Sequence, residues 1–343
     1  MPRYSFIVPI YNDGYLVHAF CESMRREMQI LFPTEGLSRS VEVIFVNDGS
    51  RDNSQYLLQE AARNFEFVKV IELSRNFGQH IAVSCGYRFA TGDYVGMINV
   101  DMQDPPDQIG KIAERLRSGD CDIVVGLRQE RRDPWFENVT SKGFNLLLNF
   151  LTGSKTPLNA ASLRLMTRPF VDAYNAFSEK TPFIPGLENW LGFRRDYVTI
   201  RHQQRQQGKS SYTFRKRLHM AKESIIGFSD LPLRMAAGMG AMVTVVGLML
   251  IAGLVIQKLF FADMLPGYTS TLCVIVLLGG ANLLFLGLVG LYIGRILHEV
   301  QDRPRYIIKS LENFSVPQMV PADVVDAVND LLRPIHAKRR PEG

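Results

Sequence analysis

The first third of the chain alternates short apolar runs, rich in Val and Ile, with longer segments in which apolar positions recur at helical spacing. Strands of this composition, separated by helices, are typical of an α/β fold with a mostly parallel sheet covered by helices. The expected strands are Tyr4–Ile10, Val41–Asn47, Phe67–Leu73, Tyr94–Val100 and Asp122–Leu127, and the expected helices lie around Gly14–Phe32, Asn53–Asn64, Gln79–Ala90 and Pro106–Ser118.

Two long stretches without charged residues, Met235–Ile256 and Thr269–Gly294, lie in the last third of the chain. As helices with a rise of ~1.5 Å per residue, each is longer than the ~30 Å of hydrocarbon in a bilayer. They predict two transmembrane helices. The alternative is a buried helical hairpin in a soluble core.

Basic residues flank this pair of stretches, whereas the connecting loop 257–268 holds one Lys and one Asp. By the positive-inside rule, the N-terminal domain and both termini are expected in the cytoplasm. Thr213–Phe228 mixes basic and apolar residues, which predicts an amphipathic helix in the membrane interface or, alternatively, a surface helix of the soluble domain. The net charge of +5 is modest and forms no single basic tract, so membrane lipids are favoured as a partner and nucleic acid is not.

These segments divide the chain into four parts. We expect a cytoplasmic domain over residues 1–212, an interfacial helix over 213–230, a transmembrane hairpin over 231–298 and a cytoplasmic tail over 299–343. The four cysteines are scattered without metal-binding spacing, so we expect reduced thiols.

Polar residues follow the expected strands, and ligands of such sheets bind at the carboxyl ends of the strands. No GxGxxG and no GxxxxGK[ST] motif is present, which argues against a dinucleotide site and an ATPase. Tyr11 could cover a base or ribose, and Asp48 could accept a hydrogen bond from a base. The alternative for Asp48-Gly49-Ser50 is a helix-capping turn. Asn99–Asp107 gathers oxygen ligands suited to Mg²⁺ or Mn²⁺ bridging a diphosphate.

The segments YND, VNDGSRDNS, NFGQHIAVSCGYRFATGD and VDMQDPPD, in that order, resemble the family-2 inverting glycosyltransferases. The polyprenyl-phosphate branch, with dolichyl-phosphate mannose synthases and bacterial undecaprenyl-phosphate sugar transferases, is most similar. The likeness runs from about residue 4 to 309 and includes both apolar stretches. It implies a glycosyltransferase A-type Rossmann-like domain, a nucleotide-diphospho-sugar donor, a metal ion and a polyprenyl phosphate acceptor used for the cell envelope. It leaves open whether the chain forms a homo-oligomer.

The resemblance also implies roles for individual residues. The implied donor-binding residues are Pro9, Tyr11, Asp13, Asp48, Gln79, His80, Asn99 and Asp101; the implied metal ligands are Asp101 and Gln103; the implied acceptor-phosphate residues are Arg128, Ser141, Lys142, Arg205 and Ser210; and the candidate catalytic residues are Asp101, Arg128 and Glu188.

The sequence departs from the family pattern at several of these places. Asn99 replaces the first acid of the metal motif, which puts metal affinity or metal choice in doubt. On the acceptor side, Glu137 and Ser211 replace basic residues and Leu158 replaces an acid. Glu188 occupies a position that is apolar in the branch, where it is either a general base or a helix N-terminal acid.

We therefore expect an inverting transferase that moves a sugar to polyprenyl phosphate at the cytoplasmic membrane face. A phosphate acceptor is already ionised at neutral pH and needs no strong base, whereas a sugar hydroxyl does. The first alternative is accordingly a transferase that uses Glu188 to activate a sugar hydroxyl of a lipid-linked glycan. The second is a non-catalytic membrane scaffold, supported by Asn99 and Leu158 alone. The alternative for Arg128 and Arg131 is that both are solvated surface charges.

Overall fold

The structure is a computed structural model that describes most of the N-terminal two thirds of the chain and a part of the remainder. The described residues are 3–33, 40–128, 157, 159–201, 203, isolated positions between 236 and 256, 267–301 and 303–314. The chain divides into two compact units: one contains 1–143, 155–211 and 304–343, and the other contains 144–154 and 212–303.

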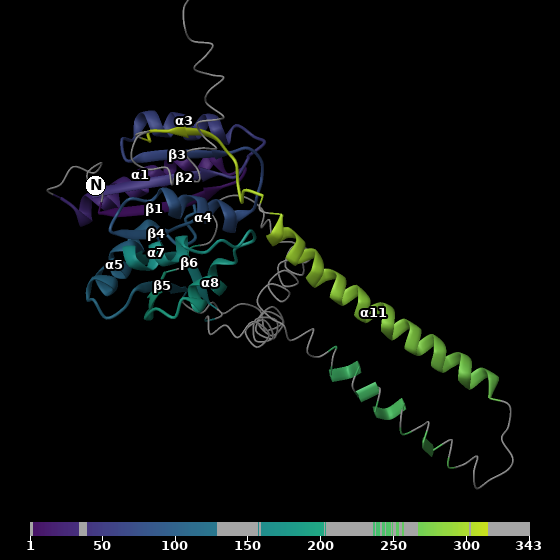
Figure 1. The fold of residues 1–343 in the computed structure, drawn as a ribbon. Coiled ribbons are helices and arrows are strands. Elements are labelled where there is room, and N and C mark those ends of the chain that lie inside the picture. Colours follow the sequence, from purple (N-terminus) through teal and green to yellow (C-terminus); the bar gives the residue numbers. More distant parts are fainter. Residues whose placement is uncertain are drawn as a thin grey trace, which may run out of the picture. The chain divides into compact units, whose positions relative to one another are not determined.

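The described part of the first unit forms an eight-stranded sheet with the order β7-β5-β6-β4-β1-β2-β3-β8 (Figure 1). Strand β1 pairs in parallel with both β2 and β4, and β2 pairs in parallel with β3. The antiparallel pairs are β3 with β8, β4 with β6 and β5 with β6. The strands are β1 Tyr4–Ile10, β2 Val41–Asn47, β3 Val68–Leu73, β4 Tyr94–Met97, β5 Ile123–Arg128, β6 Ala160–Thr167, β7 Arg195–Ile200 and β8 Ile308–Glu312.

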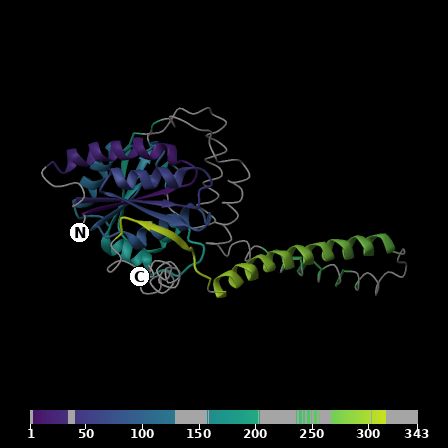
Figure 2. The same cartoon turned by 90° about the horizontal axis from the view of Figure 1, so that it is seen from above.

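Helices cover both faces of this sheet (Figure 2). Helix α1 packs against α3 on one face, and α4 packs against α7 on the other. The helices and short 3-10 turns of this unit are η1 Gly14–Leu16, α1 Val17–Leu31, α3 Ser54–Asn64, α4 Gln79–Phe89, η2 Pro106–Gln108, α5 Ile109–Arg117, α7 Arg168–Asn175 and α8 Ile184–Trp190.

The predicted α/β fold with a mostly parallel sheet is confirmed. All five expected strands are present, with β4 ending three residues early at Met97. The Ile7 oxygen accepts a hydrogen bond from the Ile98 nitrogen at 3.1 Å, so Pro9, two residues further along β1, points its nitrogen toward the same side. Proline has no N–H to donate, so the pairing of β1 with β4 stops there and the chain after β4 can turn away.

Strand β1 illustrates why the sheet has two layers of helices. Phe6 and Val8 belong to the apolar cluster that also contains Phe20 of α1, whereas Ile7 points to the opposite face. There it meets α4 at Gly86, where a Cβ would lie 2.3 Å from the Ile7 Cγ2. Only glycine permits this close approach of α4, which brings the first turn of α4 to the strand ends.

The C-terminal part of the first unit adds a strand that the sequence pattern did not predict. Strand β8 pairs antiparallel with β3, and the Ser74 nitrogen donates to the Ile307 oxygen at 2.9 Å. Glu72 accepts hydrogen bonds from Lys309 at 2.6 Å and from Ser310 at 2.8 Å. The expected tail over 299–343 therefore includes the edge strand of the sheet.

The second unit contributes α11, Tyr268–Val300, a helix of 33 residues. Within the described residues, no helix meets the combined length and hydropathy requirements of a membrane span. The expected interfacial helix at Thr213–Phe228 and much of the stretch Met235–Ile256 lie outside the described residues.

Candidate functional site

The carboxyl ends of three neighbouring parallel strands form one edge of the sheet. Strands β4, β1 and β2 are adjacent and point the same way, so the residues that follow them converge. The sequence-predicted residues Tyr11, Asp48 and Asn99 follow β1, β2 and β4 in turn. This edge is where a ligand of a mostly parallel sheet is expected to bind.

Side chains and backbone of the first two strand-end loops hold each other. Asn12 has a φ of 57°, its nitrogen donates to the Ser50 Oγ at 3.0 Å, and its Oδ1 accepts from the Arg51 nitrogen at 2.9 Å. Tyr11 directly precedes Asn12 and is 42% exposed. An exposed ring on a fixed loop can cover a base or ribose, as predicted for Tyr11, without an ordering step.

Asp48 is buried and fixes the loop that leads into α4. Its Oδ1 accepts from the Phe77 nitrogen at 2.7 Å and its Oδ2 accepts from the Gly78 nitrogen at 2.9 Å. Burial raises the pKa of this carboxyl, and the two backbone N–H groups partly offset that increase. Asp48 thus holds the residues just before α4. The alternative of a capping turn had placed it at the start of α3 instead.

The first turn of α4 carries Gln79 and His80. Gln79 Nε2 donates to the Asn99 Oδ1 at 3.3 Å, which links α4 to the loop after β4. The His80 ring makes an edge contact with Phe183, with 5.4 Å between ring centroids. Burial lowers the pKa of His80 to about 4, with a further contribution from the positive charge of Arg164. His80 is therefore neutral at physiological pH.

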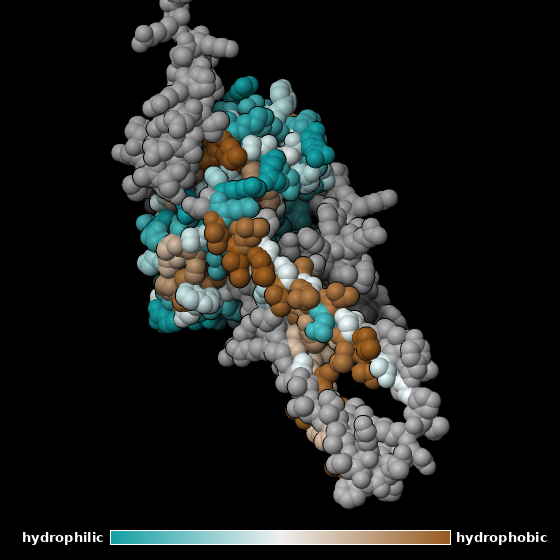
Figure 3. All heavy atoms as spheres, turned by 45° about the vertical axis from the view of Figure 1, so that its right-hand side comes forward, coloured by the Kyte–Doolittle hydropathy of each residue, from teal (hydrophilic) through white to brown (hydrophobic). Residues whose placement is uncertain are grey.

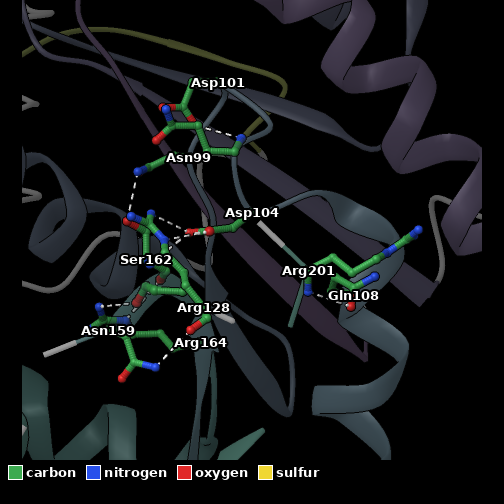
Figure 4. A network of polar contacts seen from close by, with 11 residues as sticks. Asn99, Asp101, Asp104, Gln108, Arg128, Asn159, Ser162, Arg164 and Arg201 are labelled. Carbon is green, nitrogen blue, oxygen red and sulfur yellow. Dashed lines mark hydrogen bonds and ion pairs between the residues drawn. The ribbon is translucent and has the colours of Figure 1, made fainter. Parts of the chain in front are cut away.

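The predicted metal ligands lie on a tight turn after β4. Met102, between Asp101 and Gln103, has a φ of 53°, and the Gln103 nitrogen donates to the Asp101 Oδ1 at 3.2 Å. Asn99 is held separately, since its Nδ2 donates to the Ser162 Oγ at 2.9 Å (Figure 4). A left-handed backbone at a methionine is uncommon and is found where the surrounding structure enforces it, often at functional sites.

These oxygen groups fit a hard divalent cation that takes further ligands from a diphosphate and water. The described residues contain no group of three or more His, Cys, Asp or Glu side chains placed to hold a metal ion. Asp101 supplies the carboxylate, and Gln103 and Asn99 supply amide oxygens. The protein would therefore supply only one negative charge to the cation, and the diphosphate of the donor would supply the remaining ligands.

Arg128, at the end of β5, forms an ion pair that the sequence did not reveal (Figure 4). Its Nε and Nη2 atoms lie 3.0 Å from the two oxygens of Asp104, whose side chain is 1% exposed. The Ser162 nitrogen also donates to Asp104, at 3.0 Å. Arg128 is thus held by a buried acid and is not a solvated charge. The acidic run in VDMQDPPD was the available signal for Asp104.

Glu188, the candidate base, lies buried in α8. Its two carboxylate oxygens lie 2.7 and 2.9 Å from the Arg164 Nη1, and Arg195 lies 3.9 Å away. Because a general base must reach a substrate proton, this paired and buried position favours a structural role for Glu188. It is an internal charge pair between α8 and β6, which the helix N-terminal interpretation did not anticipate.

The chain after β7 returns to the loop that carries the predicted metal ligands. The Gln203 nitrogen donates to the Gln103 oxygen at 2.9 Å, and Arg201 forms an ion pair with Asp107. The segment with the predicted acceptor residues Arg205 and Ser210 follows directly in the sequence. Four predicted acceptor residues, Ser141, Lys142, Arg205 and Ser210, lie outside the described residues, as do Glu137, Leu158 and Ser211.

Comparison with known proteins identifies the class. The family model for glycosyl transferase family 2 matches residues 5–174. The glycosyltransferase YkcC of Bacillus subtilis, whose own function is uncharacterised, is 34% identical over 308 residues, which cover 90% of this chain and 93% of the relative. The chain belongs to glycosyl transferase family 2, and it is a glycosyltransferase.

The chain is also similar to two proteins whose names state a substrate. The SfII prophage-derived bactoprenol glucosyl transferase of Shigella flexneri is 34% identical over 308 residues, covering 90% of this chain and 97% of the relative. A mannosyltransferase from Pyrobaculum calidifontis, solved with GDP-Man and Mn²⁺, covers 88% of both chains at 15% identity with a TM-score of 0.46. At that level the structural similarity carries no argument about activity.

The low pKa of His80 predicts a pH-dependent stability. Between the ordinary value of 6.5 and about 4, the unfolded chain binds a proton that the folded chain does not. Stability should therefore fall as pH falls through this window, and His80→Gln should remove part of that slope. Thermal unfolding measured across this range checks the prediction. His18→Gln, at an exposed histidine of α1, is the matched control, and an identical change of slope in both variants would contradict it.

Because Glu188 is paired and buried, we expect Glu188→Gln to lower the stability of the fold and to leave the turnover number unchanged. Removing the charge leaves Arg164 unpaired in the interior, at a cost of about 3 kcal/mol in the free energy of unfolding. The turnover number per folded molecule should stay close to wild type. Denaturant unfolding and kcat measured on the same preparation separate the two effects. Loss of turnover in a fully folded variant would instead support Glu188 as the base for a hydroxyl acceptor.

Proposed function

We propose that this glycosyltransferase moves one sugar from a nucleotide-diphospho-sugar to polyprenyl phosphate, with inversion at the anomeric carbon. The observation that carries the proposal is its similarity to bactoprenol glucosyl transferases over 97% to 99% of their length. The matched region extends beyond the family domain at 5–174 and so includes the segments that would meet a lipid acceptor. The product would serve synthesis or modification of cell-envelope polysaccharide.

The residues at the carboxyl ends of β1, β2 and β4 support the proposed binding of the donor. Tyr11 is exposed on a fixed loop, and Asp48 orders the start of α4, where Gln79 and His80 lie. Pro9 lies one residue before the end of β1, and Asp13 directly precedes η1. A nucleoside diphosphate placed along this edge would have its base near Tyr11 and its phosphates near the turn at Asp101.

A divalent cation fits the acid–amide set on that turn. Asp101 and Gln103 would hold Mg²⁺ or Mn²⁺, with Asn99 as a neutral neighbour. When bound, the cation would neutralise charge on the departing nucleoside diphosphate. The chain's own residues would orient the diphosphate and exclude alternative positions for it.

The charges of the described residues favour a phosphate acceptor over a sugar hydroxyl. Asp104 and Glu188, two buried acids of this region, are engaged by Arg128 and Arg164 and do not offer a ready base. A phosphate oxygen can attack without one, because it is already ionised. Arg128, which carries an intact guanidinium fork, suits such an anion. Ser141, Lys142, Arg205 and Ser210 remain candidates to complete the acceptor site.

We also propose that the chain is an integral membrane protein with its catalytic domain and both termini in the cytoplasm, in the inner membrane if it is bacterial. The support is the pair of uncharged stretches with basic flanks. Apolar side chains of α11, among them Leu283, Leu286 and Ile293, are exposed along the helix (Figure 3). Exposed apolar surface of this kind is typical of contact with lipid or another apolar partner. The proposal sets no number of copies.

Direct transfer tests the function. Purified protein with Mn²⁺ or Mg²⁺, undecaprenyl phosphate and a panel of labelled nucleotide sugars should yield a lipid-soluble sugar from at least one donor. Asp101→Asn should lower the rate by about a hundredfold or more, since it removes a charge that holds the cation. Transfer only to a lipid-linked saccharide would replace the phosphate acceptor by a hydroxyl. Absence of any nucleotide binding would favour the non-catalytic scaffold.

The neutral Asn99 predicts weak metal binding that an acid would strengthen. In Asn99→Asp, the Ser162 hydroxyl can donate to the new carboxylate, so the local contact survives with reversed polarity. We expect Mn²⁺ affinity, measured by electron paramagnetic resonance with the product nucleoside diphosphate, to rise about tenfold. Asn64→Asp, the same change at the exposed end of α3, should leave the affinity unchanged. Equal affinities in Asn99→Asp and wild type would place Asn99 away from the cation.

A further inference from the structure

We propose that Asp104 is a positioning residue that aims the guanidinium of Arg128 at the acceptor phosphate. This inference rests on the proposed function, because it gives Arg128 a phosphate to meet. The sequence placed Asp104 in the oxygen-rich run Asn99–Asp107, but predicted no role for it on the acceptor side. The evidence is the burial of the acid, the orientation of the ion pair and the loop to which the acid belongs.

The two partners of the pair differ in exposure. The side chain of Asp104 is 1% exposed, whereas that of Arg128 is 31% exposed. An ionised acid so deeply buried is stable only with close partners, and its oxygens receive Arg128 Nε, Arg128 Nη2 and the Ser162 nitrogen, each at 3.0 Å. The acid is thus the fixed end of the pair, and the arginine is the end that reaches the surface.

The pairing uses one particular edge of the guanidinium. Arginine has five N–H donors, and the pair with Asp104 occupies Nε–H and one N–H of Nη2. The remaining donors, on Nη1 and Nη2, form the end-on fork that matches two oxygens of a phosphate. Asp104 therefore orients Arg128 and still leaves it a complete fork for an anion.

The backbone of Arg128 is held as firmly as its side chain. Its nitrogen donates to the Asn159 oxygen at 2.9 Å, and its own oxygen accepts from the Asn159 Nδ2 at 2.8 Å. Figure 4 shows Arg128, Asp104, Asn159 and Ser162 as one connected group at the ends of β5 and β6. An arginine restrained at both ends loses little further freedom when it binds an anion.

The position of Asp104 in the chain adds a geometric consequence. It lies three residues after Asp101, within the same turn that carries the predicted metal ligands. A single displacement requires the attacking phosphate and the departing diphosphate to be placed relative to each other, and small misplacements are costly in rate. Through Asp104, one loop would set both positions: the leaving group by Asp101 and the acceptor by Arg128.

Asp107 provides a matched control on the same segment. It also pairs with an arginine, Arg201, but both side chains of this pair are exposed, Asp107 at 42% and Arg201 at 62%. An exposed pair of this kind contributes little to stability, and its arginine is not one of the predicted acceptor residues. Asp107→Asn should therefore leave acceptor kinetics unchanged.

The test measures acceptor and donor kinetics in full-length protein with undecaprenyl phosphate in detergent and the donor that wild type uses. Asp104→Asn should raise the KM for undecaprenyl phosphate about tenfold, because the charge that holds Arg128 is lost. The donor KM should change less than twofold if Asp104 acts on the acceptor alone. Asp104→Glu keeps the ion pair but displaces the guanidinium by about the length of one methylene group. It should therefore also raise the acceptor KM. The thermal midpoint of this variant should stay near that of wild type.

The outcomes separate this inference from the proposed function. If wild type transfers sugar to undecaprenyl phosphate but Asp104→Glu has the wild-type acceptor KM, Asp104 does not position Arg128 and the proposed function stands. If wild type transfers no sugar to undecaprenyl phosphate, both fall. If Asp104→Asn fails to fold, the Asp104→Glu result alone decides, because a purely structural acid would be rescued by glutamate.

Discussion

The parallel pairing of β1 with β2 on one side and with β4 on the other is the constraint on which the rest of the site depends. It places three strand ends side by side, so that loops far apart in sequence share one edge of the sheet. Helix α4 packs closely on β1 at Gly86, and the pairing of β1 with β4 ends opposite Pro9. Beyond the end of β4, the chain leaves the sheet and carries Asp101 on its turn.

Buried acids tie the elements around this edge together. Asp48 holds the loop before α4, Asp104 holds the end of β5, and Glu188 holds β6 from α8. On the opposite end of the sheet, Glu42 accepts hydrogen bonds from Ser5 and Lys69, both at 2.5 Å. Buried charges of this kind cost desolvation free energy, so they add less to stability than their number suggests. Their effect is to fix which side chains meet, and that is what a substrate site needs.

The ion pairs of these buried acids also limit which of them can act as a general base. An enzyme that activates a hydroxyl needs a carboxylate with a free approach to the substrate. The acid that the sequence offered for this role, Glu188, is bound to Arg164 inside the domain, and the acid next to Arg128 is used to hold it. A substrate that arrives already ionised is compatible with such a site. Arg128 and Glu188, the two described residues that the sequence proposed for acceptor chemistry, are thus both held by buried ion pairs.

The sequence by itself determined the first five strands, their helices and the strand-end loops that carry the predicted ligand-binding residues, because periodicity and strand-end polar runs are local signals. It did not predict β6, β7 or β8. Strand β8 depends on a partner, β3, that lies more than two hundred residues earlier in the chain. The sequence proposed Arg128 and Glu188 as functional residues, but only the tertiary structure decided what each contacts. Ion pairs between distant elements depend on which side chains the packed sheet and helices bring together, and no local pattern records that.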